Sequence, residues 1–153
     1  MQADTTPTGL QDHLGYWLRL VSNHVSAAFA RRLDGQGVTV AEWVMLREMF
    51  GADPLPPSRL ADRMGMTRGA ISKLADRLLD KGLLARTADP DDGRAHTLSL
   101  TDTGNALVPT LARLADQNEA EFFAVLTAEE KEAVEAALRR VVAHRGLTGV
   151  PVT

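Results

Sequence analysis

The sequence contains no cysteine among its 153 residues. Disulfides, thiolate catalysis, thiol-based redox sensing and cysteine-ligated zinc are therefore excluded, and a reducing compartment is compatible with the chain. Long apolar runs are also missing, because no stretch reaches the roughly 18 apolar residues that a membrane span requires. The first residues, MQADTTPTGLQDH, include no basic or apolar targeting segment. We therefore expect a cytoplasmic protein with no membrane partner.

Sequence motifs of catalysis and metal binding are equally scarce. There is no glycine-rich phosphate loop, no G-x-S-x-G and no HExxH. No two of the four histidines stand at the i, i+4 spacing of a helical metal site. The acidic turn DPDDG, residues 89–93, departs from a calcium loop, because its glycine falls one position early and no glutamate closes the loop. We expect no enzymatic activity, no cofactor and no metal.

The charge of the chain is unevenly distributed. Its net charge is −3, yet residues 59–86 hold seven cations against three anions, an excess of four. A distant acidic surface barely cancels such a cluster, because charges are screened over about 8 Å at physiological salt. The segment is therefore suited to a polyanion such as DNA, although ordinary solvated helix faces remain the alternative. The seven cations are Arg59, Arg63, Arg68, Lys73, Arg77, Lys81 and Arg86.

Hydrophobic periodicity predicts mostly helices. Apolar residues at spacings of three and four predict a long amphipathic helix from Leu10 to Arg32, and Thr39 with Glu42 opens a second helix as a capping box. GADPLPP then interrupts the chain, with room for a short strand near Leu55. A short helix follows over residues 58–64, and a tight turn at Gly65 leads to the next helix, which is capped by Thr67 and ended by Gly82.

Two short helices joined by a tight turn form a helix-turn-helix, so the outer face of the second helix matters most. Its inner positions are Ile71, Leu74, Ala75 and Leu78. The remaining positions carry small, hydrogen-bonding or cationic side chains, which suit contacts to base edges in a DNA major groove. The candidate DNA-binding residues on this helix are Thr67, Arg68, Gly69, Ser72, Lys73 and Arg77.

A two-stranded ribbon is predicted directly after this helix. LLARTA and HTLSL are strand candidates, and DPDDG between them provides the turn. A ribbon in this place is a wing, whose tip falls beside the minor groove when the helix lies in the major groove. Arg94 is then the minor-groove probe, and Asp92 orders the tip by accepting hydrogen bonds from the backbone or from Arg94.

Amphipathic helices are predicted on both sides of this unit. Thr101 starts one that passes Leu107, Leu111 and Leu114, and Thr127 with Glu130 forms a capping box for the last. Their apolar rows exceed what one small domain can cover, so we expect self-association into a homodimer. The expected division is an N-terminal helix for dimerisation in residues 1–38, a winged helix-turn-helix in 39–100 and C-terminal dimerisation helices in 101–153.

One stretch carries a family resemblance. LADRMGMTRGAISKLADRLLDKGLLARTADPDDGRAHTLSLTDTG, residues 60–104, resembles the winged helix of the MarR family of bacterial transcription regulators. The most specific elements are DKGLL, SLTDTG and the wing sequence Asp92-Gly93-Arg94, which is similar to the family's D-x-R. The resemblance implies an obligate homodimer on a pseudo-palindromic operator. Two departures are Gly93, where the family often has a second arginine, and Pro109, which is expected to kink the first C-terminal helix.

The resemblance also implies a small aromatic or phenolic effector. Candidate ligand residues on the first two long helices are His13, Trp17, His24, Trp43 and Arg47, although aromatic residues at helical spacing are more often core. The sequence thus predicts a mainly α fold with a small β-wing and a homodimeric, DNA-binding transcription regulator, acting as a repressor. A winged helix used only for protein contacts, or one that binds DNA without a ligand, remains the alternative.

Overall fold

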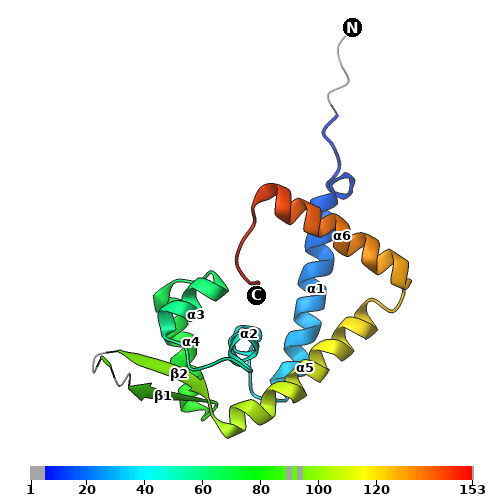
Figure 1. The fold of residues 1–153 in the computed structure, drawn as a ribbon. Helices are drawn as coiled ribbons and strands as arrows, with labels where there is room; N and C mark the ends of the chain where they lie inside the picture. The colour runs from blue at the N-terminus through cyan, green and yellow to red at the C-terminus, as the bar shows by residue number, and fades with distance from the viewer. Residues whose placement is uncertain (1–5, 89–90, 93–94, 153) are drawn as a thin grey trace.

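The computed structural model describes residues 6–88, 91–92 and 95–152. Within them the chain forms six α-helices, one short 3₁₀ helix and one antiparallel pair of strands. In chain order these are η1 (Leu10–Asp12), α1 (Leu14–Asp34), α2 (Val40–Met49), α3 (Pro57–Met64), α4 (Arg68–Asp80), β1 (Leu84–Ala88), β2 (His96–Leu100), α5 (Asp102–Phe122) and α6 (Ala128–Arg145). The mainly helical fold with a small wing is confirmed. Figure 1 shows α3, α4 and the strands on one side of the molecule, α1, α5 and α6 on the other, and α2 between them.

Threonine caps begin four of the helices, as the sequence predicts. Thr39, Thr67, Thr101 and Thr127 each accept a hydrogen bond from the backbone N–H three residues later. Each cap thus satisfies one of the amide groups that the first turn of a helix leaves without a partner. At Thr127 the backbone N–H in turn donates to Oε1 of Glu130, which completes the predicted capping box.

The beginning of the first helix differs from the prediction. His13 is extended, with φ −99° and ψ 127°, and its Nδ1 lies 3.0 Å from the carbonyl oxygen of Gly9. The predicted helix from Leu10 is therefore wrong in its first turn, because η1 is separate and α1 begins at Leu14. The apolar spacing continues across this break, so periodicity does not reveal it.

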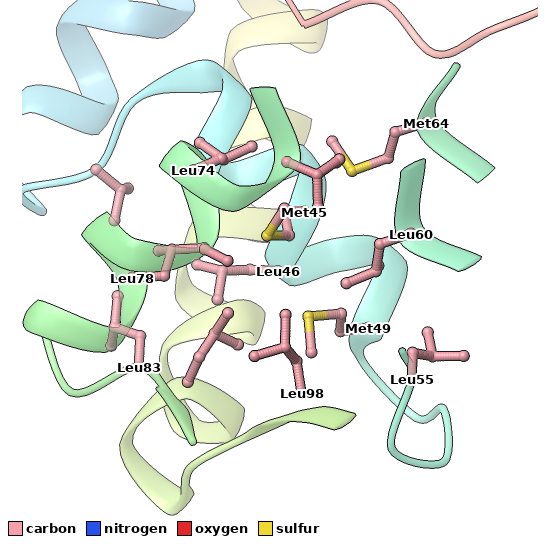
Figure 2. Packing of buried hydrophobic residues seen from close by; sticks show 14 of the residues in the cluster. Met45, Leu46, Met49, Leu55, Leu60, Met64, Leu74, Leu78, Leu83 and Leu98 are labelled. Carbon is pink, nitrogen blue, oxygen red and sulfur yellow. The ribbon is translucent and has the colours of Figure 1, made fainter. Parts of the chain in front are cut away.

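The core lies within the winged helix, around α2. Figure 2 shows Met45, Leu46 and Met49 of α2 pointing toward side chains of α3, α4 and the strands. The inner positions predicted for α4 are all buried, and so are Leu60, Ala61 and Met64 of α3. Leu55 forms the predicted short strand contact as an isolated bridge to Leu98, which adds an edge to the wing sheet. This shared core fixes the outer face of α4 relative to the wing.

α5 connects the winged helix with α1. It continues as one helix through Pro109, and its first half buries Val108 and Leu111 against the core. Further along, Asn118 Nδ2 donates to the carbonyl oxygen of Val25 at 3.2 Å, and Arg32 forms an ion pair with Glu121. Among the helices in the described residues, none is long and apolar enough to cross a membrane.

The C-terminal segment returns to the winged helix after α6. Figure 1 shows it leaving α6 and ending near α2 and α3. The N–H of Val150 donates to the carbonyl oxygen of Met64 at 3.4 Å, and Val152 packs against the core. Gly65 contacts the same segment so closely that a Cβ added to it would lie 2.8 Å from the Cα of Gly149. The segment therefore covers the turn between α3 and α4.

Candidate nucleic-acid interface

Helix α4 is fixed by its inner face and by the turn before it. Ile71, Leu74 and Leu78 are buried in the core. Gly65 ends α3 in the left-handed region at φ 62°, and the Met66 N–H donates to the carbonyl oxygen of Ala61 at 3.0 Å. This conformation costs glycine little, and it lets the chain reverse within two residues. The orientation of α4 therefore follows from one glycine and one apolar face.

The outer face of α4 gathers the predicted DNA-binding residues. Thr67, Arg68, Gly69, Ser72, Lys73 and Arg77 all lie on α4 or at its N-cap, and all are exposed. A Cβ added at Gly69 would meet no atom within 4 Å, so the backbone there is open to close approach by a partner. The structure thus brings together three cations, two hydroxyl groups and one open glycine on a single surface.

A hollow lies beside this surface. Its volume is about 320 Å³, and its walls come from the start of α3, from α4 and from the beginning of β2, near the tip of the wing. Arg68 and Ser72 line it together with two residues that the sequence prediction missed, Ser58 and His96. Ser58 follows a proline pair at the start of a helix, which is a detectable signal, whereas the placement of His96 depends on strand register.

The two strands predicted for the wing pair with each other in an antiparallel ribbon. Leu84 pairs with Leu100 at one end and Ala88 with His96 at the other. Near the tip, the Ala95 N–H donates to the carbonyl oxygen of Asp92 at 3.0 Å. Asp92 is exposed, and Arg94, the predicted minor-groove probe, lies outside the described residues.

Two of the seven cations are engaged within the protein. The side chain of Lys81 donates to Glu42 at 2.5 Å and to the carbonyl oxygen of Gly37 at 2.8 Å. Arg86 lies 3.4 Å from Asp76, a pairing between half-exposed side chains that contributes little to stability. The ammonium group of Lys81 is therefore bound by the winged helix itself, so Lys81 adds less to the basic surface than its place in the charge cluster indicates. The cations on the outer face of α4 are Arg68, Lys73 and Arg77.

The predicted ligand residues do not all lie close together in the folded chain. Trp43 contacts Phe29 edge to face at a ring-centroid distance of 6.3 Å. Trp17 lies twelve residues before Phe29 on α1, which corresponds to about 18 Å of helix, and its Nε1 donates to the carbonyl oxygen of Gln11. His13 precedes α1, His24 is exposed, and Arg47 stacks over Phe50 at 5.8 Å. Within one chain, His13 and Trp17 are therefore remote from Trp43.

Comparison with known proteins identifies the family of this chain. The family model described as MarR family matches residues 36–95. The HTH-type transcriptional repressor MdtR of Bacillus subtilis is 31% identical over 113 residues, which make up 74% of this chain and 73% of that protein. The chain belongs to the MarR family. It is therefore a DNA-binding transcriptional regulator of the MarR type, and regulators of this family are not enzymes.

Solved MarR-type structures share the architecture. A probable transcriptional regulator from Pseudomonas aeruginosa is 31% identical, with a TM-score of 0.77 over 87% of this chain and 99% of that one. A mutant of MarR from E. coli, complexed with operator DNA, is 26% identical, with a TM-score of 0.76 over 84% of this chain and 93% of that one. The match to most of each chain includes the helices outside the winged helix.

Proposed function

We propose that this MarR-family chain acts as a homodimeric repressor that reads a pseudo-palindromic operator with α4. The observation that supports this proposal most directly is the outer face of α4, which is exposed, cationic and free of acidic residues from its N-cap through Lys73. A helix used only for protein contacts would carry an apolar, charge-poor face instead. The mutant MarR that resembles this chain was crystallised with operator DNA, which agrees with the same use of the fold.

The N-terminal half of α4 is proposed to enter the major groove. Arg68 and Lys73 can bond O6 and N7 of guanine, and Ser72 or Thr67 can donate to or accept from several base edges. Gly69 lets the backbone approach without a side chain in between. Phosphate contacts, which set register rather than sequence preference, are proposed for Arg77 further along the helix and for Ser58 and His96 in the adjacent hollow.

The wing is proposed to supply a minor-groove contact through Arg94. An arginine is attracted to narrow A·T stretches because their minor groove has an enhanced negative potential. The backbone carbonyl oxygen of Asp92 accepts from the Ala95 N–H close to that position in the chain. The Asp92 carboxylate is proposed to order the tip as well, and so to serve the loop rather than the DNA.

Homodimer formation is proposed to cover the apolar rows of α1 and α6. All residues of Ala128–Arg145 are described, and none of them is buried. Val134, Leu138 and Val141 are 41–54% exposed, and on α1 Leu14, Trp17 and Leu18 are 41–74% exposed. Such rows cost free energy in water, and a second copy of the chain removes them from solvent. The proposed units are residues 1–38 and 101–153 for dimerisation and 39–100 for DNA binding.

Release of the operator by a small aromatic effector completes the proposal. An open hollow of about 230 Å³ lies between α1 and α5 and is lined by Val25, Phe29 and Asn118, among others. Phe29 also contacts Trp43, one of the predicted ligand residues. An aromatic molecule here would bind between α1 and α5, the helix that leads to the winged helix. It would so favour one distance between the two α4 helices of the proposed dimer.

Operator selection tests the proposal. Purified protein is titrated against fragments of its source genome at two salt concentrations, and the fragments retained at the higher salt are sequenced. A near-palindrome with half-sites about one helical turn apart is expected, and Ser72→Ala should change its preferred bases. Uniformly weak binding that vanishes with salt across all fragments would contradict sequence-specific recognition and would favour a protein-contact role.

A further inference from the structure

The three residues after α4, Lys81, Gly82 and Leu83, contact two other parts of the chain. We call them the 81–83 junction. They end the recognition helix, with Gly82 in the left-handed region and the Leu83 N–H bonded to the carbonyl oxygen of Leu78 at 3.0 Å. The α4 residues proposed to contact DNA, Thr67 through Arg77, all precede the junction, so it is free for another role.

On one side the junction is attached to the loop between α1 and α2 and to the start of α2. Lys81 Nζ donates to the carbonyl oxygen of Gly37, in the link between α1 and α2, and to Oε2 of Glu42 in the first turn of α2. Glu42 is only 1% exposed. A buried carboxylate requires a partner, because an unpaired charge in the core is strongly unfavourable. The position of the ammonium group is therefore tightly determined.

On the other side the junction is attached to the start of α5. Thr101 Oγ1 donates to the carbonyl oxygen of Gly82 at 2.7 Å, and the Thr101 N–H donates to that of Leu83 at 3.1 Å. The Cα of Gly104 approaches so closely that an added Cβ would lie 2.2 Å from the Leu83 oxygen. This packing gives the motifs DKGLL and SLTDTG a common physical role, since each supplies one half of the contact.

We propose that the 81–83 junction couples the recognition helix to both dimerisation arms, with Lys81 and Thr101 as positioning residues. The arms are α1, which continues into the loop that contains Gly37, and α5, which leads to α6. A shift of either arm then moves the end of α4 as a rigid lever, because packed elements respond by discrete displacement rather than by gradual deformation. The inference rests on the proposed function and deepens it, since it explains how the distance between the two α4 helices of the dimer is set.

Matched substitutions separate this role from direct DNA contact. Lys81→Met removes the attachment to Gly37 and Glu42, whereas Lys73→Met removes one cation from the outer face of α4 and leaves the junction intact. Thr101→Val removes the hydroxyl bonded to Gly82, and Thr101→Ser restores it. If Lys81→Met fails to fold because Glu42 is left unpaired, the double variant Glu42→Gln/Lys81→Met and the Thr101 pair replace it.

A distance measured without DNA provides the decisive readout. Because the chain has no cysteine, Thr87→Cys on β1 and Asp116→Cys on α5 create two exposed spin-label positions. Doubly labelled chains are diluted with unlabelled chains, so that double electron–electron resonance measures the distance between the two spin labels of one chain. A narrow distribution is expected for the otherwise native chain, for Lys73→Met and for Thr101→Ser, and a broadened one for Lys81→Met and Thr101→Val.

Operator titration completes the test. Lys81→Met and Thr101→Val should lower affinity for the selected operator about tenfold, the size typical of coupling between sites, and should tolerate altered half-site spacing better than the native chain. An unchanged distance distribution in both variants would overturn the proposal, whatever happens to DNA binding. If the native chain bound no operator at all, the proposed function would fail, while the distance measurement would still decide the role of the junction.

Discussion

Two glycines, Gly104 and Gly69, would respond in opposite ways to the addition of a Cβ atom, because one is packed against the backbone and the other is exposed. Gly104 lies against the backbone of Leu83, whereas Gly69 faces open space on the outer surface of α4. A methyl group is therefore a clash at one position and an obstacle only to a partner at the other. The sequence shows both as glycines next to a helix start, and it does not distinguish their surroundings.

Gly104→Ala is expected to destabilise the fold. Its new methyl group would lie 2.2 Å from the carbonyl oxygen of Leu83, so α5 and the junction must separate. Overpacking of this kind costs about 3 kcal/mol when a backbone atom has to move. Urea denaturation followed by circular dichroism measures the loss, and an unchanged midpoint would show that the contact is looser than the structure indicates.

Gly69→Ala is expected to have the opposite effect on stability. Alanine favours the helix by up to about 1 kcal/mol relative to glycine, and no atom lies within 4 Å of the added carbon. Operator affinity should nevertheless fall, because the methyl group stands between α4 and the groove. Denaturation and DNA titration on the same preparation test both halves. Unchanged operator affinity would remove Gly69 from the interface.

At the scale of elements, the sequence predicts caps and faces well and long-range partners poorly. Thr39 and Thr127 share the same local pattern, with a glutamate three residues on, yet only Glu130 completes its capping box. Glu42 instead bonds Lys81, which is 39 residues away in the chain. Local spacing contains no information about that partner. The candidate ligand residues are a related case, because their spacing in the sequence does not show that Trp17 and Trp43 lie far apart within one chain.

The two ends of α4 are expected to differ in their response to salt. Arg77→Ala should reduce the slope of log affinity against log salt by roughly 0.9, which corresponds to one lost phosphate contact. Base preference should stay the same, in contrast to Ser72→Ala. Arg139→Ala, which removes a cation from α6, is the matched control and should leave the slope unchanged. Equal slopes for Arg77→Ala and the native chain would argue against a phosphate contact at Arg77.

At the scale of the whole molecule, the exposed apolar rows decide how the chain assembles. α6 buries none of its residues within the described chain, and the N-terminal half of α1 is similarly exposed. The sequence predicts these rows from periodicity, and none of the elements described in the structure buries them fully. The geometry of the dimer depends on the second copy, which neither periodicity nor a single chain determines.

Leu138→Glu is expected to dissociate the dimer. It places a charge in the apolar row of α6, where burial against a second copy would leave that charge unpaired. Ala136→Glu adds the same charge on the opposite face of α6 and serves as the control. Sedimentation equilibrium should give monomers for the first variant and dimers for the second. Dimers in both would show that another surface holds the two copies together.

Hydroxyl-radical footprinting of the selected operator tests dimeric recognition by α4 most directly. The native chain is expected to protect two patches on one face of the duplex, with centres about 34–36 Å apart, and Leu138→Glu should weaken both patches together. A single protected patch, or protection spread evenly along the duplex, would contradict a homodimer that presents two copies of α4 to successive major grooves.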